Sequence, residues 1–240
     1  MKAIILAAGC GRRLSTMGWN KPKCLLHFGE QTLLENIITS LIDNNIQQLS
    51  VVVGYQYELI VEVLEKYDIQ FNVTINDNYA TTNTIHSLYL ARNYLDDDFI
   101  YFNADILFDH RIIFGLLSQK GNVFAVDVGP CRQEEVKVIV DENQRIVSIG
   151  KELVPDKCLG EFIGIGKFSR SACPEMISSL CRYNEQLNRQ NLFFETAVND
   201  ILQQHRFTAW PIGSLSAIEI DNPQDYHQAM QLWLSKKIET

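Results

Sequence analysis

Short apolar runs alternate with amphipathic segments through the first half of the chain, and this alternation sets narrow limits on the fold. Residues 2–7 and 49–53 are apolar runs of strand length. Between them, the apolar residues of segment 32–41 recur every three or four positions, which is the spacing of a helix with one buried face. Parallel strands need such crossover connections. The pattern therefore predicts βαβ units around a parallel sheet.

The second half of the chain has a different pattern. Residues 136–140 and 145–149 alternate as two strands, and the turn-rich tripeptide Asp141-Glu142-Asn143 lies between them. This combination predicts a β-hairpin, which we interpret as an insertion or lid. The other expected elements are strands over 70–75, 99–102, 162–168, 207–212 and 217–220, and helices over 58–67, 83–94, 174–181, 193–204 and 225–233.

Composition and charge exclude several classes of protein. The 240 residues suffice for one domain with a sizeable core, and we expect a single domain over residues 1–240. The formal net charge of −8 argues against nucleic acid as a partner, because binding a phosphate backbone needs a basic surface. No window approaches the roughly 18 apolar residues of a membrane-spanning helix, so we expect no membrane partner and a cytoplasmic location. The six cysteines form no C-x-x-C pair, which disfavours zinc and a disulfide framework.

The first apolar run leads into a glycine-rich, basic loop. Gly9 and Gly11 allow backbone amides to approach an anion without a Cβ between them. Arg12, Arg13 and Lys23 add positive charge where the charge of a triphosphate would gather. These residues predict a phosphate cradle. The glycines alone are equally compatible with a tight turn whose arginines are solvated.

Two aspartates stand where apolar runs end. Asp105 follows the run at 99–102, and Asp221 follows the run at 217–220. Ligands bind at the carboxyl ends of strands in open α/β sheets, and carboxylates suit the hard ion Mg²⁺. We therefore expect Asp105 and Asp221 to share a Mg²⁺ ion. The alternative is a turn role for Asp105 and a helix N-cap role for Asp221.

The segment Leu6-Ala7-Ala8-Gly9-x-Gly11-x-Arg13-Leu14, followed by Pro22-Lys23, resembles the signature of the sugar-phosphate nucleotidyltransferase superfamily. The resemblance implies a Rossmann-like three-layer α/β/α fold of the nucleotide-diphospho-sugar transferase type, with a mixed, mostly parallel central sheet and the hairpin as a lid. It further implies a nucleotide-binding half over residues 1–128 and an acceptor-binding half with the lid over residues 129–240. Leu14 occupies the third glycine position of a dinucleotide-binding motif, so a nicotinamide-binding domain is disfavoured.

The resemblance also assigns roles to residues. It implies that Arg13 and Lys23 are catalytic, stabilising charge during transfer, and that Asp105 and Asp221 hold the metal. The acceptor's phosphate oxygen would attack the α-phosphorus of an NTP and release pyrophosphate, with no protein nucleophile. The residues expected to bind the nucleotide are Leu6, Ala7, Ala8, Gly9, Gly11, Arg12, Gly54, Tyr55, Asn83, Thr84 and Ser87.

The choice of nucleotide rests on the segment 76–88. It resembles the Asn-x-x-Ser-Leu segment of the cytidylyltransferases for phosphocholine, inositol phosphate and phosphonoalkyl compounds, and a Pro-x-Gly-Thr-Ala-like stretch of hexose-1-phosphate enzymes is absent. We therefore favour CTP. Asn83, Thr84 and Ser87 would bind the cytosine edge or the acceptor phosphate, and Asn83 also suits a helix cap. A hexose-1-phosphate uridylyl- or thymidylyltransferase and a non-catalytic nucleotide-binding regulatory protein remain alternatives.

The acceptor is a small phosphorylated or phosphonylated metabolite in this interpretation. Lys137 and Lys151 are candidates to hold its phosphate or phosphonate, although a lysine on a hairpin is commonly solvated. Glu161 and Glu195, with nearby aromatic side chains, are candidates to surround an ammonium group. Inositol phosphate is a close alternative to such an amino-alcohol phosphate. The sequence leaves a homo-oligomer open.

Overall fold

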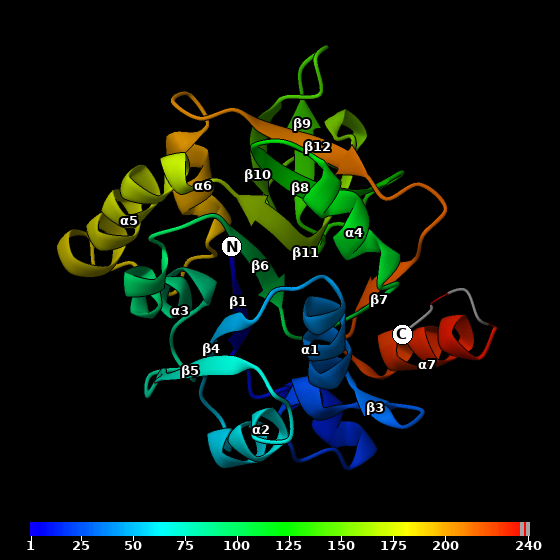
Figure 1. Ribbon diagram of the computed structural model, residues 1–240. Helices are drawn as coiled ribbons and strands as arrows, with labels where there is room; N and C mark the ends of the chain where they lie inside the picture. The colour runs from blue at the N-terminus through cyan, green and yellow to red at the C-terminus, as the bar shows by residue number, and fades with distance from the viewer. Residues whose placement is uncertain (236–237, 239–240) are drawn as a thin grey trace.

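A computed structural model describes residues 1–235 and residue 238, and its central feature is a mixed sheet of nine strands with helices on both faces (Figure 1). One path through the sheet runs in the order β10 (Ile146–Gly150), β9 (Lys137–Val140), β11 (Gly160–Phe168), β6 (Phe99–Asn103), β1 (Lys2–Ala7), β4 (Gln48–Val53) and β5 (Gln70–Ile75). In addition, β8 (Asn122–Val128) pairs with β11 and with β12 (Phe207–Pro211). Strands β6, β1, β4 and β5 are parallel to one another, as the sequence predicts.

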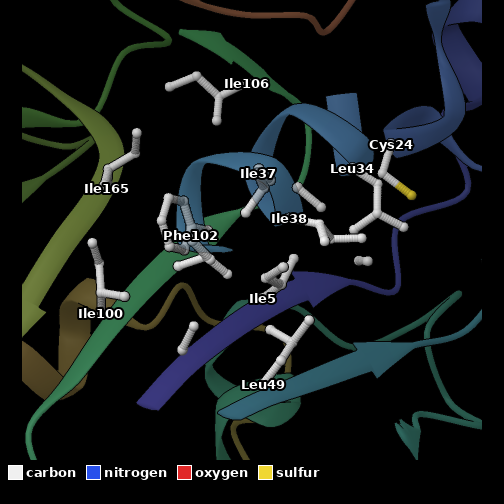
Figure 2. Packing of buried hydrophobic residues seen from close by; sticks show 14 of the residues in the cluster. Ile5, Cys24, Leu34, Ile37, Ile38, Leu49, Ile100, Phe102, Ile106 and Ile165 are labelled. Carbon is white, nitrogen blue, oxygen red and sulfur yellow. The ribbon is translucent and has the colours of Figure 1, made fainter. Parts of the chain in front are cut away.

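The central strand β1 shows how the two faces of the sheet are built. Side chains alternate across a strand, so Ile4 and Leu6 pack on one face while Ala3 and Ile5 pack on the other. Figure 2 shows Ile5 close to Ile38 of the first helix. Both faces of β1 are buried, which explains why its sequence is a continuous apolar run instead of an alternating one.

The helices divide between these two faces. The core on the Ile5 face includes residues of α1 (Leu33–Asp43), α2 (Tyr57–Leu64) and α4 (Arg111–Ser118). The opposite core includes residues of α3 (Thr84–Leu90), α5 (Cys173–Cys181) and α6 (Glu195–Ile201). A third, smaller core contains Ala229 of α7 (Pro223–Leu234). Within the described part of the chain, no helix is long and apolar enough to cross a membrane.

Short elements complete the chain. Two small sheets pair β2 (His27–Phe28) with β3 (Gln31–Thr32) and β7 (Ile106–Phe108) with β13 (Ala217–Glu219). The tighter helical turns are Arg12–Met17, Lys23–Leu25, Arg92–Tyr94, Pro155–Lys157 and Arg170–Ala172, and a π-helical turn spans Arg182–Gln186. The β7–β13 pair matters most for the site, because it joins two segments that are distant in sequence and that lie next to Asp105 and Asp221.

Most expected elements are present, with shifted ends. The short strands β2, β3 and β7, the strand β8 and the helix α4 were not predicted, although β8 pairs with both β11 and β12. The predicted hairpin is present as β9 and β10, but it continues the central sheet through the pairing of β9 with β11. Its action as a lid stays a prediction.

Candidate active site

The glycine loop leaves β1 at the carboxyl edge of the sheet and turns sharply at Gly11. Gly11 has a φ of 57° in the left-handed region, and a Cβ placed there would lie 3.2 Å from Cγ of Lys23. Both observations favour glycine. The helical turn Arg12–Met17 follows directly, so Arg12 and Arg13 are the first two residues after the bend. The loop therefore brings its arginines and Lys23 to the same place.

The pairing of β7 with β13 brings Asp105 and Asp221 together. Ile106 pairs with Glu219, and the backbone N–H of Ile220 donates to the carbonyl of Asp105 at 2.9 Å. The two aspartates come from distant parts of the chain, as the two predicted strand ends required. The alternative of an N-cap at Asp221 is wrong, because Asn222 caps α7 with hydrogen bonds to the N–H groups of Gln224 and Asp225.

Lys23 lies between the two aspartates. Its Nζ is 2.6 Å from Oδ2 of Asp105 and 2.6 Å from Oδ1 of Asp221, and Nη2 of Arg13 is 2.8 Å from Oδ2 of Asp221. Only 11% of the Lys23 side chain is exposed, so water screens these ion pairs weakly. We call Arg13, Lys23, Asp105, Glu219 and Asp221 the charged cluster.

The carboxylates control the protonation of this cluster. Burial by itself lowers the pKa of Lys23, but the charges of Asp105 and Asp221 outweigh it and hold that pKa above its usual value. Burial by itself raises the pKa of Asp221, but the charges of Lys23 and Arg13 outweigh it and lower that pKa. Lys23 is therefore a cation and Asp221 an anion at neutral pH.

The same carboxylates form a set that suits a hard cation. Asp105, Glu219 and Asp221 each offer one oxygen, and these oxygens lie within 4.8 Å of one another. Oxygen donors are the ligands that Mg²⁺ prefers, and the ammonium of Lys23 shows that the position between Asp105 and Asp221 accommodates positive charge. Glu219 was not among the ligands predicted from the sequence. Its position in the apolar run at 217–220, two residues before Asp221, was the available signal.

A cavity of about 450 Å³ opens beside the charged cluster. It is lined by most of the residues predicted to form the site, namely Leu6, Ala8, Gly9, Gly11, Arg12, Arg13, Lys23, Asn83, Thr84, Ser87, Asp105, Lys151, Glu195 and Asp221. The lining residues that the sequence analysis left without a role include Asn76, Tyr79, Asn103 and Glu219. A cavity of this size is within the range of small-molecule sites.

Uncharged polar side chains form another part of the lining, and we call Asn76, Asn83, Thr84 and Ser87 the neutral wall. Asn83 caps α3 by accepting a hydrogen bond from the N–H of Thr84 at 2.8 Å, so the predicted capping role is confirmed. The hydroxyl of Thr84 accepts from the N–H of Phe194 at 2.9 Å. The amide of Asn76 donates to Ser87 at 3.2 Å, which fixes this serine against the strand end.

Glu195 and Lys151 form the third part of the lining. Glu195 is buried, and its Oε2 has no hydrogen-bond partner among the described residues. Burial raises the pKa of Glu195 to about 7. The ammonium of Lys151 lies 4.7 Å from the ring centroid of Phe193, which also lines the cavity. A buried carboxylate without a partner indicates a place for a donor or a cation from a ligand.

Two predicted acceptor residues lie outside this lining. Lys137 is fully buried, and its ammonium donates to the carbonyls of Arg132, Gln133 and Glu135 at 3.3, 2.7 and 3.0 Å. All three of its donors are used there, so the expectation that Lys137 holds a phosphate is not supported by the geometry. Glu161 stands opposite Lys137 on β11, where burial and the charge of Glu135 raise its pKa to about 7.

Ala7, Gly54 and Tyr55 also lie outside the lining. Gly54 packs closely against the start of the glycine loop, since a Cβ at Gly54 would lie 2.8 Å from the carbonyl oxygen of Ala8. The hydroxyl of Tyr55 donates to the carbonyl of Asn20 at 3.3 Å, and its ring lies 6.3 Å from that of Tyr79. Gly54 and Tyr55 thus contact the segments that form the cavity, and nucleotide binding by these residues and Ala7 stays a prediction.

The chain is similar to known proteins over most of its length. The model of the nucleotidyl transferase family matches residues 2–209. The chain is 27% identical to the choline-phosphate cytidylyltransferase of Streptococcus pneumoniae, over 97% of this chain and 98% of the relative. It is 29% identical to the CTP:phosphoglutamine cytidylyltransferase of Campylobacter jejuni, over 80% of this chain and 81% of the relative. Among solved structures, the CTP:phosphocholine cytidylyltransferase of Streptococcus pneumoniae superimposes with a TM-score of 0.83 at 24% identity, covering 96% of this chain and 98% of that one.

Proposed function

The chain belongs to the nucleotidyl transferase family, and from this membership we propose that it transfers CMP from CTP to a small metabolite that carries a phosphate or phosphonate, releasing pyrophosphate. The observation that carries the proposal is the position of Lys23 between Asp105 and Asp221 beside the glycine loop, in one cavity with the neutral wall. Both relatives named above are cytidylyltransferases that act on small phosphorylated compounds, which supports CTP over other nucleotides.

The charged cluster explains how such a transfer is catalysed. A phosphate oxygen of the acceptor attacks the α-phosphorus of CTP, and the bond to pyrophosphate breaks. Negative charge grows on the leaving group, and Arg13 and Lys23 are placed to bind it, because both cations line the cavity that would hold the triphosphate. Fixed positive groups of this kind stabilise the transition state without reorganisation, so no nucleophile from the protein is required.

Magnesium completes the charge balance in this proposal. Asp105, Glu219 and Asp221 would hold the ion, since their oxygens form the one set of this kind among the described residues. When bound, Mg²⁺ neutralises part of the triphosphate charge and polarises its oxygens. The chain's own residues position the substrates: the loop at Gly9 and Gly11 accommodates the phosphates closely, and the carboxylates orient Lys23.

The acceptor is proposed from Glu195, Lys151 and Phe193. A cationic head group would supply the partner that Oε2 of the buried Glu195 lacks, and the ring of Phe193 offers an additional surface for an ammonium. Lys151 has the charge to bind the acceptor's phosphate or phosphonate. We therefore propose an amino-alcohol phosphate or aminoalkyl phosphonate, with inositol phosphate as the alternative, because Glu195 also accepts a hydroxyl.

Two further elements of the interpretation are proposals. The division into a nucleotide-binding half over 1–128 and an acceptor half over 129–240 is supported by Lys151 and Glu195, which come from the second half, although Asp221 in that half belongs to the metal set. A cytoplasmic location is proposed because the NTP substrate is an intracellular metabolite.

A substrate panel tests the proposal. Pyrophosphate release is measured with each of four NTPs against phosphocholine, phosphoethanolamine, aminoethylphosphonate, inositol phosphate and hexose phosphates. We expect turnover with CTP and an ammonium-bearing acceptor. Turnover confined to UTP or dTTP with a hexose phosphate would replace the proposal with the alternative enzyme class. No turnover with any pair, together with tight NTP binding, would favour a regulatory protein.

A further inference from the structure

The side-chain amide of Asn76 has an orientation that the structure determines. Asn76 follows β5, is 1% exposed, and accepts a hydrogen bond through Oδ1 from the backbone N–H of Asn78 at 3.0 Å. A backbone N–H only donates, so the amide oxygen must face it and the amide nitrogen must face the other way. That nitrogen lies 3.0 Å from the hydroxyl oxygen of Thr82 and 3.2 Å from that of Ser87. Asn76 therefore donates to both hydroxyls.

This orientation determines what the Ser87 hydroxyl offers to a ligand. Its oxygen accepts from Asn76, so its own proton needs an acceptor elsewhere. Thr82 meets the same requirement by donating to the carbonyl of Asn78 at 2.9 Å. Within residues 1–235 and 238, Ser87 has no such acceptor, and its side chain lines the cavity. The Ser87 proton is therefore available to an acceptor atom of a ligand.

Pyrimidine bases differ in the atom that such a donor meets. The ring N3 of cytosine carries a lone pair, whereas the ring N3 of uracil and of thymine carries a hydrogen. A hydroxyl that donates forms a hydrogen bond with cytosine N3, but it leaves its own proton unpaired against uracil or thymine. An unpaired buried donor is costly, so this single contact discriminates between the bases.

We propose that Asn76 is a positioning residue for base selection: it holds the Ser87 hydroxyl as a donor to the unprotonated N3 of cytosine, and so selects CTP over UTP and dTTP. The inference rests on the proposed function, CMP transfer from CTP. Asn76 does not itself have a spare donor for the base, because its amide hydrogens go to Thr82 and Ser87. Its effect on selectivity passes through the orientation of Ser87.

The first test replaces the donor with an acceptor of the same shape. In the Asn76→Asp variant, an ionised carboxylate accepts from Ser87, so the hydroxyl turns its proton away from the cavity and offers lone pairs to the base. We expect the ratio of kcat/KM for CTP to that for UTP to fall by roughly tenfold to a hundredfold. Asn72→Asp is the matched control, because Asn72 lies on β5 and donates to Thr74 at 3.3 Å outside the cavity. Its ratio should equal that of the wild type.

The second test does not depend on whether the Asn76→Asp variant folds with a buried carboxylate. We compare CTP with 3-deaza-CTP, in which a C–H group replaces N3, using the wild type and Ser87→Ala. The wild type should prefer CTP by roughly tenfold or more, and Ser87→Ala should lose that preference. A purely structural role of Ser87 would leave the preference for CTP over its 3-deaza analogue unchanged.

The outcomes separate this inference from the proposed function. A wild type that takes no CTP contradicts the proposed function. The inference about Asn76 and Ser87 is overturned, and the proposed function stands, if the wild type uses CTP and Ser87→Ala still discriminates against UTP and 3-deaza-CTP by the wild-type factors. An increase in KM for the acceptor in Ser87→Ala, with unchanged base preference, would also overturn it, since the hydroxyl would then bind the acceptor's phosphate.

Discussion

The charged cluster and the neutral wall line the same cavity but are built from different chemistry. The cluster holds its groups by ion pairs, with Lys23 at 2.6 Å from each of two carboxylates. The wall holds its groups by hydrogen bonds between uncharged side chains and backbone, as Asn76 and Thr84 show. All NTPs carry the same triphosphate, so the cluster is not expected to distinguish them, whereas the wall is proposed to meet the base, which differs. From this comparison we expect rate and selectivity to be controlled by separate residues.

The largest expected effect comes from removing a carboxylate of the cluster. We expect Asp105→Ala to lower kcat by roughly a thousandfold, because it removes a proposed metal ligand and one anchor of Lys23. Pyrophosphate release measures the loss, and circular dichroism checks that the variant is folded. The residual activity should keep the wild-type ratio of kcat/KM for CTP to kcat/KM for UTP. A fully active variant would contradict the metal assignment, and a changed ratio would contradict the separation of rate from selectivity.

The next effect concerns Lys23. We expect Lys23→Met to lower kcat by roughly a hundredfold, since the charge on the leaving group loses a stabilising cation. The same variant should bind Mn²⁺, used as a probe for Mg²⁺, more tightly in the absence of nucleotide, because the ammonium no longer lies between Asp105 and Asp221. Electron paramagnetic resonance measures free Mn²⁺ directly. Weaker Mn²⁺ binding than in the wild type would show that the metal does not use these carboxylates.

A smaller effect is expected at Glu195, which lies in neither set. We expect Glu195→Gln to raise KM for an ammonium-bearing acceptor by roughly tenfold, because the variant loses the charge that attracts it. KM for CTP should stay unchanged. Steady-state kinetics with each substrate varied in turn separate the two. An equal increase in both constants would place Glu195 in the nucleotide site instead.

Glu195 also gives a prediction for stability against pH. The pKa of its carboxyl is raised by burial from an ordinary 4.5 to about 7, so between these values the folded state holds a proton that the unfolded state releases. Wild-type stability should therefore fall as pH rises from about 4.5 through about 7. Glu195→Gln has no titrating carboxyl at this position, so its stability should not fall in this way. At pH 8 the variant should be more stable than the wild type by on the order of 3 kcal/mol. Urea titrations without substrate at pH 4.5 and pH 8 measure the difference, which should vanish at the lower pH.

The smallest kinetic effect is expected at Lys137. Its ammonium is used by three backbone carbonyls outside the cavity, so Lys137→Met should leave both KM values within about twofold of the wild type. Stability should fall by roughly 1–3 kcal/mol, because buried carbonyls lose their donor. Thermal unfolding and acceptor kinetics test both statements. A large rise in acceptor KM would restore the original expectation that Lys137 binds the acceptor.

Much of the fold was predictable because its signals are local. The strand at β1, the helix α1 with its cap at Thr32, and the hairpin β9–β10 each follow from periodicity or turn residues within a short window. The strand β8 was not assigned. Its residues end in Asp127-Val128 with the last two side chains exposed, so the apolar run is short, and only pairing with β11 and β12 shows its place.

The chemistry of the loop and of the strand ends was visible in the amino-acid sequence: Gly9, Gly11, Arg13, Lys23 and the two aspartates were all identified without the structure, and each lines the cavity. Periodicity and turn chemistry act over a few residues, which is why these features are visible in the sequence.

The way in which those residues combine could not be predicted, because it depends on the packing of distant segments. Packing brings Lys23 against Asp221 across 198 residues of chain, adds Glu219 to the carboxylates and orients Asn76 toward Ser87. It also buried Lys137 among backbone carbonyls. The physical reason is that a side chain's partners are set by the packing of distant segments, and the same lysine can be an active-site cation or a structural donor according to which oxygens surround it.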